Sequence, residues 1–228
     1  MNVSGNDFLV TRALADLDSR LPDNQKQIDL YVVGGYALQL MGVRTDIAEA
    51  TDVDYIGTTF DIGVKALLDA VGLKYGLGKG WINNDLLLNE SDSLSELEAL
   101  VGKLEFIKVD LPALQHFQIY AAIPESVLRM KIVAIDTTLT QYLDETSAND
   151  YVRPQDFGDV TMIVKQLGWS PDKLVRLVNE MGEAGYLLVP RETAAAVRQS
   201  LRTGNIVNIL DAARRVEMVT STATTWEN

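Results

Sequence analysis

The chain contains no cysteine. Disulfide bonds, thiolate zinc sites and cysteine nucleophiles are therefore excluded, and the absence suits a reducing compartment. Histidine is nearly absent as well, because His116 is the only one. Its place in an alternating segment favours a surface or hydrogen-bonded core residue over a catalytic base.

Signals for export and for membrane insertion are also missing. The N-terminal residues contain no basic segment followed by an apolar run, and no stretch approaches the ~20 consecutive apolar residues of a membrane helix. We therefore expect a cytoplasmic protein with no membrane partner.

Basic residues are scarce relative to acidic ones. The chain has 20 Lys and Arg against 32 Asp and Glu, which gives a formal net charge of −12. Such a charge repels polyanions unless a local basic patch or a metal ion intervenes, so extensive nucleic-acid binding is disfavoured. With 228 residues, 47% of them hydrophobic and 23% charged, the chain can form one full globular domain or a core with a smaller appended one.

Hydrophobic periodicity predicts an α/β (α+β) fold. In the first half we expect helices over residues 6–20, 36–41 and 60–72 and strands over residues 28–33, 52–57, 104–109 and 116–120. The irregular region 74–103 predicts loops and a short helix. Further helices are expected from residue 125 onward and over residues 155–167, 170–184 and 191–217. We accordingly predict a core over residues 1–124 with a helical C-terminal part, residues 125–228, packed on it.

One segment combines a glycine turn with paired aspartates. Gly34 and Gly35 follow the first predicted strand and open a helix, and Asp52 and Asp54 lie on the next strand. Glycines at such a turn let backbone N–H groups approach a phosphate, which a helix N-terminus also favours. Aspartates at positions i and i+2 of a strand face the same side, so both carboxylates can hold one divalent cation. The lysine of a P-loop and the G-x-G-x-x-G of a dinucleotide-binding fold are lacking, which excludes those alternatives.

The order of these motifs resembles the signature of the DNA polymerase beta-type nucleotidyltransferase superfamily. The residues that carry the resemblance read VVGGYALQLMGVRTDIAEATDVDYIG. Two later segments, ESVLRMKIVAID and RPQDFGDVTMIV, are similar to paired motifs of the abortive-infection toxin nucleotidyltransferases and their uncharacterised bacterial relatives. Those relatives often carry a glycine-rich stretch and Trp-Ile-Asn between the two halves, as GLGKGWINND does here. The resemblance covers roughly residues 28–168.

The resemblance implies a nucleotidyltransferase core with a small mixed sheet flanked by helices. It also implies a set of nucleotide-binding and metal-binding residues. Gly34, Gly35, Arg44 and Thr51 would bind the nucleoside triphosphate, and Asp52 and Asp54 would bind Mg²⁺ or Mn²⁺ and take part in catalysis.

The later motifs supply further catalytic candidates by the same resemblance. Lys131 matches a lysine placed near the phosphates, and Asp156 matches a late catalytic acid. Asp159 matches a helix-capping or orienting group of that motif.

The sequence departs from the family pattern in two respects. Sixteen residues separate Gly35 from Asp52, more than is usual, and an alternative alignment would use the element Arg44-Thr45-Asp46. Only Asp52 and Asp54 have the i, i+2 spacing. A third carboxylate has no clear match, and the candidates by position are Glu105, Asp110 and Asp85.

Three functions follow from these observations. The first is a Mg²⁺-dependent nucleotidyltransferase that transfers a nucleoside monophosphate to a hydroxyl of RNA, such as a tRNA 3′ end, of a protein or of a small molecule. Its role could be that of a toxin in a toxin–antitoxin or phage-defence system, with an antitoxin protein as partner. The second is a catalytically degenerate protein of the same fold that binds a nucleotide or a partner protein. The third is an antibiotic-type small-molecule nucleotidyltransferase, since an acidic surface attracts cationic acceptors.

Overall fold

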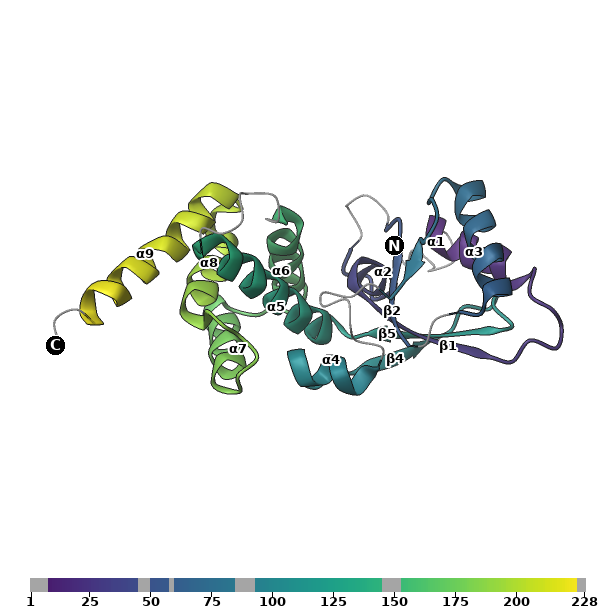
Figure 1. Ribbon diagram of the computed structural model, residues 1–228, viewed down its shortest axis with the longest axis horizontal. Coiled ribbons are helices and arrows are strands. Elements are labelled where there is room, and N and C mark those ends of the chain that lie inside the picture. The colour runs from purple at the N-terminus through teal and green to yellow at the C-terminus, as the bar shows by residue number, and fades with distance from the viewer. Residues whose placement is uncertain (1–7, 45–49, 58–59, 85–92, 145–152, 225–228) are drawn as a thin grey trace. The chain divides into compact units, whose positions relative to one another are not determined.

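The computed structural model describes residues 8–44, 50–57, 60–84, 93–144 and 153–224 (Figure 1). Two compact units make up the chain. Met1–Ala99 and Lys103–Val127 form the N-terminal unit, and Leu100–Gly102 and Leu128–Asn228 form the C-terminal unit. The boundary expected from sequence lay between residues 124 and 125.

A five-stranded mixed sheet forms the centre of the N-terminal unit. Its strands are β1 (Ile28–Val33), β2 (Val53–Ile56), β3 (Ile82–Asn83), β4 (Phe106–Val109) and β5 (Phe117–Ala122), in the order β3-β2-β1-β5-β4. β1 runs antiparallel to β2 and parallel to β5, while β3 is parallel to β2 and β4 is antiparallel to β5. The expected mixed α/β fold is confirmed.

Burial alternates only over part of β1. Asp29 is exposed and Leu30 is buried, as the two-residue period of a strand allows, whereas Val32 and Val33 at the end of the strand are both buried. Helices α1 (Leu9–Asp18) and α3 (Ile62–Tyr75) pack against each other beside the sheet, and α2 (Gly34–Leu40) contacts β1, β2 and β5 (Figure 1).

The C-terminal unit is helical. It comprises most of α5 (Pro124–Leu143), together with α6 (Pro154–Gln166), α7 (Pro171–Glu183), α8 (Pro190–Thr203) and α9 (Ile206–Thr224). Each of α6, α7 and α8 begins with a proline in its first turn, where the missing N–H costs no helical hydrogen bond.

The prediction of a single helix over residues 191–217 is wrong. The structure has two helices there, because Gly204 ends α8 in the left-handed conformation with φ 61° and α9 starts two residues later. The strand β3 and the helix α4 (Leu94–Val101) lie in the region for which loops and a short helix were expected.

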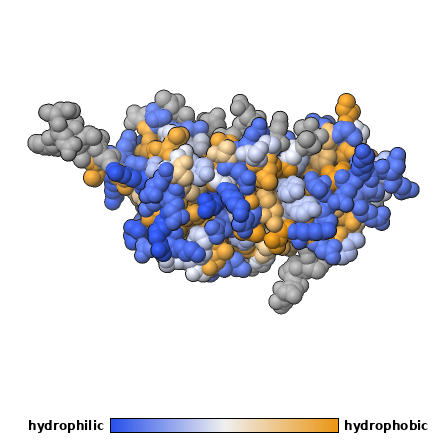
Figure 2. Space-filling view, turned by 90° about the horizontal axis from the view of Figure 1, so that it is seen from below, coloured by the Kyte–Doolittle hydropathy of each residue, from blue (hydrophilic) through white to orange (hydrophobic). Residues whose placement is uncertain are grey.

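The described surface alternates in polarity. Hydrophilic and apolar side chains are interspersed over the face drawn in Figure 2, as is usual for globular proteins. Among the described residues, no helix combines the length and the apolar character that crossing a bilayer requires.

Candidate functional site

The turn between β1 and α2 is built around Gly34. Val33 ends β1 in an extended conformation, and Gly34 then adopts φ +65°, a region that disfavours residues with a Cβ atom. The chain can therefore pass directly from strand to helix without an intervening loop.

Strand pairing places Asp54 against this turn. Val33 and Asp54 are register partners in the antiparallel β1–β2 pair. A Cβ atom built on Gly34 would lie 2.5 Å from Oδ2 of Asp54, so the carboxylate occupies the space that any other side chain would need. Gly34 is thus required both for its backbone conformation and for the close approach of Asp54.

Arg44 lies against the second glycine of the turn. A Cβ atom on Gly35 would lie 2.6 Å from Nη1 of Arg44. The backbone reaches this position because the N–H groups of Val43 and Arg44 both donate to the carbonyl of Leu38 at the end of α2. A carboxylate and a guanidinium therefore flank adjacent glycines, and the structure brings together four of the predicted residues, Gly34, Gly35, Arg44 and Asp54.

Asp52 and Thr51 lie just before β2 rather than within it. Both residues are exposed, and Asp54 is half-buried. Buried Val53 separates the two aspartates, so an extended chain places their side chains on the same side of β2.

The sheet also brings in a residue that the sequence arguments missed. Asn83 of β3 is the register partner of Asp54 on the side away from β1. Its carboxamide oxygen is a ligand atom of the kind that hard divalent cations prefer. The glycine-rich segment ending in Trp-Ile-Asn carried a signal, but only the strand pairing assigns Asn83 to this position.

Two of the candidates for a third carboxylate lie away from Asp54. Glu105 and Asp110 flank β4, which is separated from β2 by β1 and β5, a distance of about 14 Å at the usual strand spacing. Glu105 is exposed and pairs with Lys103 at 3.3 Å. Asp110 follows Val109, which pairs with Ile119 of β5, and Ile119 pairs in turn with Leu30 of β1. Asp110 therefore lies near the start of β1 rather than near its end. Asp85, the remaining candidate, lies outside the described residues.

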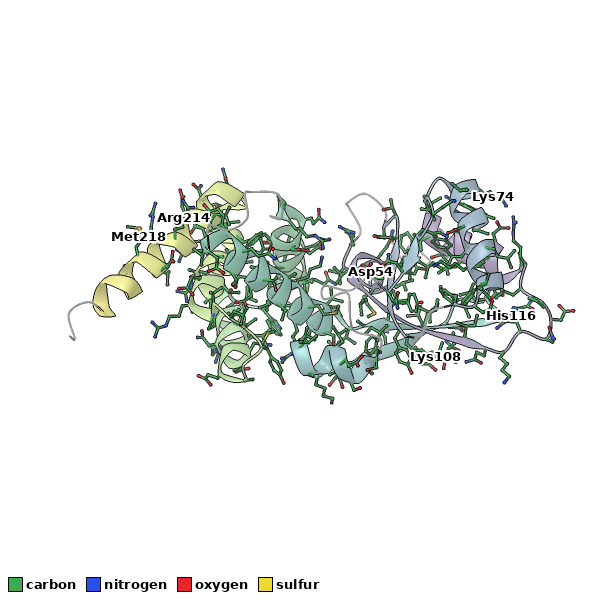
Figure 3. All side chains as sticks on the ribbon, viewed as in Figure 1. Asp54, Lys74, Lys108, His116, Arg214 and Met218 are labelled. Carbon is green, nitrogen blue, oxygen red and sulfur yellow. The ribbon has the colours of Figure 1, made fainter. Side chains whose placement is uncertain are left out.

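Trp81 has a structural role, and His116 lies far from Asp54. Trp81 is 1% exposed, and its indole N–H donates to the carbonyl of Leu68 at 2.9 Å, so it anchors its loop on the core. His116 lies at the far end of the sheet from Asp54 (Figure 3), with Nδ1 3.4 Å from Asp18 Oδ2. The side chain of His116 is 14% exposed, and its Nδ1 is buried with no hydrogen-bond partner among the described residues, so the expectation of a hydrogen-bonded or surface side chain is wrong.

Lys131 lies in the C-terminal unit between two carboxylates. Its Nζ is 2.6 Å from Asp156 Oδ1 and 2.9 Å from Asp159 Oδ2, and both aspartates are almost fully buried. Burial alone would lower the pKa of Lys131, but the charges and hydrogen bonds of the two aspartates outweigh it and raise this pKa above its ordinary value. The structure thus joins the three residues of the later motifs, with Asp159 inside α6 rather than at its cap.

The Lys131 cluster contains two buried carboxylates, one ammonium and the nearby guanidinium of Arg153. One ammonium faces two carboxylates, and Asp156 Oδ2 is buried with no hydrogen-bond partner among the described residues. Arg153, at the start of α6, approaches that oxygen with its Nε at 3.7 Å, and its side chain is 55% exposed.

Two further buried aspartates were missed by sequence reasoning. Asp18 accepts the backbone N–H groups of Gln115, His116 and Phe117, which ties α1 to the start of β5. Asp136 of α5 accepts from the backbone of Leu188 and Val189 and from the hydroxyl of Thr193. Both carboxylates cross-link segments far apart in the sequence.

Comparison with known proteins found no matching family model, no matching curated protein and no matching solved structure.

Proposed function

We propose that the chain is a Mg²⁺-dependent nucleotidyltransferase whose nucleotide site is the β1–α2 turn with the start of β2. The observation that carries the proposal is the contact of Asp54 with Gly34, beside the contact of Arg44 with Gly35. It supports a site in which a metal-binding carboxylate and an anion-binding guanidinium flank the two half-buried glycines of the turn.

The residues present fit a divalent cation. Asp52 and Asp54 offer carboxylate oxygens on one side of β2, and Asn83 offers an amide oxygen from the neighbouring strand. Mg²⁺ prefers such oxygen ligands and is commonly held by one or two carboxylates together with substrate phosphates. When bound, the ion supplies neutralisation of phosphate charge.

Each residue of the chain has a distinct part in this proposal. The missing Cβ atoms of Gly34 and Gly35 leave room for the side chains of Asp54 and Arg44 against the backbone. The guanidinium of Arg44 can pair with a phosphate through two N–H groups. Asp54 opposes the approach of a phosphate when no cation is present, because its carboxylate lies against Gly34. Nucleotide binding is therefore expected to require the metal.

The proposed reaction is transfer of a nucleoside monophosphate. An acceptor hydroxyl oxygen forms a bond to the α-phosphorus of a nucleoside triphosphate, the bond from that phosphorus to the α,β-bridging oxygen breaks, and pyrophosphate leaves. The hydroxyl proton passes to water. In such reactions the protein contributes chiefly positioning and electrostatic stabilisation.

A non-catalytic nucleotide-binding protein is the second candidate. It is favoured by the sheet order, which holds Glu105 and Asp110 away from Asp54 and leaves the described site with two carboxylates.

Product analysis separates the two functions. The full chain is incubated with each α-labelled nucleoside triphosphate, Mg²⁺ and RNA, protein or aminoglycoside acceptors, and both label transfer and pyrophosphate are measured. The transferase predicts label on one acceptor class with stoichiometric pyrophosphate, both lost in Asp54→Asn. Metal-dependent binding without either product supports the binding protein instead.

A further inference from the structure

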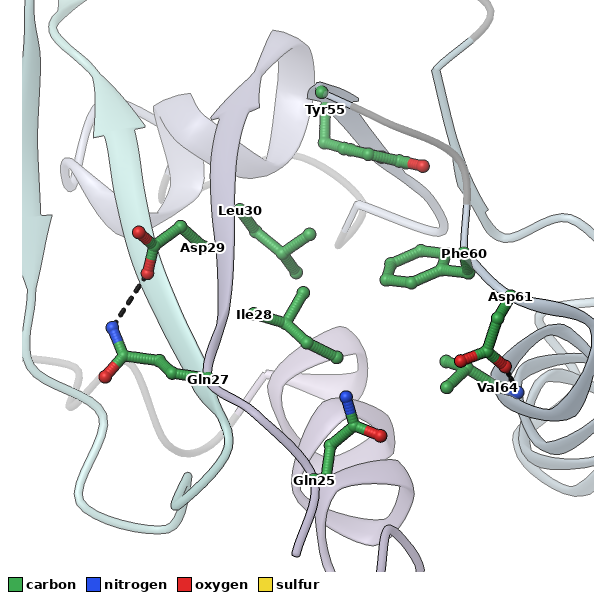
Figure 4. A pocket seen from close by; sticks show the side chains of 10 residues that line it. Gln25, Gln27, Ile28, Asp29, Leu30, Tyr55, Phe60, Asp61 and Val64 are labelled. Carbon is green, nitrogen blue, oxygen red and sulfur yellow. Dashed lines mark hydrogen bonds between the residues drawn. The ribbon is translucent and has the colours of Figure 1, made fainter.

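A cavity of about 280 Å³ opens beside the start of β1, away from the glycine turn (Figure 4). Ile28 and Leu30 of β1 point toward Tyr55 and Phe60 across it. Tyr55 follows Asp54 on β2, so the two side chains point to opposite faces of the sheet. The cavity is thus a separate site, and its assignment does not depend on the proposed nucleotidyltransferase.

Two aromatic rings border the cavity, Phe60 with partial exposure and Tyr55 with 3% of its surface exposed. The ring centroids of Tyr55 and Phe60 are 5.3 Å apart with an interplanar angle of 39°. Burial raises the pKa of Tyr55, so its phenol stays neutral at physiological pH. The electron-rich faces of such rings attract organic cations.

The charged groups that line the cavity are all acidic. Asp29 and Asp61 line it, and its described lining contains neither lysine nor arginine. Asp29 accepts from Gln27 at 2.8 Å on the other side of β1, whereas Asp61 lies beside Phe60 (Figure 4). Lys65 lines a neighbouring cavity of about 180 Å³ that shares Tyr55 and Phe60.

Asp61 has one oxygen available to a ligand. Its Oδ1 accepts the backbone N–H of Val64 at 2.9 Å and caps α3. Its Oδ2 makes no hydrogen bond to any residue in the described part of the chain. A charged carboxylate oxygen therefore stands at the rim, with the carboxamide of Gln25 also lining the cavity (Figure 4).

We propose that this cavity binds a small organic cation, an ammonium or guanidinium ion on a short alkyl chain. The charge lies at Asp61 Oδ2, and the alkyl chain lies against Ile28 and Phe60, which line the cavity and are partly exposed. The volume is close to the lower limit of about 300 Å³ for ligand pockets, which selects a small molecule.

Titrations followed by amide NMR of the labelled full chain test this assignment. Butylammonium is the probe, butylguanidinium distinguishes the two head groups, and butan-1-ol is the neutral counterpart of equal length. We expect saturable shifts confined to residues 25–30, 55–57 and 60–64 with either cation. Binding of butan-1-ol should be at least about fivefold weaker, as loss of one cation–π and charge contact predicts.

Matched variants separate the site from the general acidity of the chain. Asp61→Asn keeps a good helix cap but removes the charge, and it is expected to weaken the binding of butylammonium about fivefold. Asp172→Asn makes the same change of net charge at an exposed residue of the C-terminal unit and should leave affinity unchanged. Phe60→Leu should weaken the binding of butylammonium more than the binding of butan-1-ol.

Three results would overturn the proposal. They are equal binding of butan-1-ol, an equal effect of Asp61→Asn and Asp172→Asn, and no saturable shift at millimolar cation in a folded protein. A melting curve of each variant confirms the fold.

Discussion

Oδ2 of Asp54 fills the space in which Gly34 would carry a side chain, 2.5 Å from the position of an ideal Cβ atom. The pairing of Val33 with Asp54 brings the two residues together, and the φ of +65° at Gly34 directs the chain into α2 at the same point. A backbone turn and a carboxylate are thereby fixed in one place.

Gly34→Ala tests this contact, with Gly42→Ala as its matched control. Both glycines have similar positive φ values, 65° and 69°, but a Cβ on Gly42 would meet nothing within 4 Å. Gly42→Ala should cost about 1 kcal/mol from backbone strain alone. Gly34→Ala should cost at least about 1 kcal/mol more and abolish Mg²⁺-dependent nucleotide binding, as measured by urea denaturation and calorimetry. Equal effects of the two variants would show that the contact with Asp54 is unimportant.

Lys131→Met should destabilise the C-terminal unit by about 3 kcal/mol, because it leaves Asp156 and Asp159 buried without their cation. Lys103→Met, at a lysine whose side chain is 80% exposed, is the control and should change stability little. The triple variant in which Lys131 becomes Met and both aspartates become Asn should recover part of the loss. Thermal unfolding at neutral pH measures all three.

The contribution of Lys131 should disappear at alkaline pH. Its pKa in the folded chain is raised above the ordinary 10.5, so its stabilisation is fully present below that pH and is lost as pH rises through the folded-state pKa. The difference in melting temperature between wild type and Lys131→Met should therefore shrink above about pH 10.5. Burial also raises the pKa of Tyr36, but Tyr36 titrates in both proteins and cancels in the difference. A difference independent of pH would contradict the ion-pair assignment.

Asp18→Asn should destabilise the N-terminal unit by about 2 kcal/mol. Asn replaces one accepting oxygen by an NH₂ group that faces the backbone donors of residues 115–117. Asp23→Asn, at an exposed position of the following loop, should change stability by less than about 0.5 kcal/mol. Urea denaturation of both variants measures the contrast. If Asp18→Asn leaves the stability unchanged, the carboxylate is not what holds α1 against the start of β5.

Local patterns predicted the strand–turn–helix–strand order, and the structure confirms that β1 and β2 are adjacent. Gly34, Asp54 and Arg44 could be predicted from the sequence because they lie within one short stretch of it. Asn83 could not be predicted, since its pairing with Asp54 depends on how β3 joins the sheet edge.

The roles of the buried aspartates could not be predicted from the sequence for a similar reason. Asp18 and Asp136 serve backbone donors 97 and 52 residues away in the sequence, which no local periodicity encodes. Glu105 and Asp110 appeared suitable as strand-flanking acids, but the order β3-β2-β1-β5-β4 places them three strands from Asp54.

The most direct test of the proposed site is calorimetric titration of the four nucleoside triphosphates, with and without Mg²⁺, into wild type, Asp54→Asn and Asp110→Asn. The two variants remove the same charge from different parts of one sheet. The account predicts binding of at least one nucleotide that requires Mg²⁺, is lost in Asp54→Asn and is retained in Asp110→Asn. Binding without Mg²⁺, or binding retained in Asp54→Asn, would contradict it.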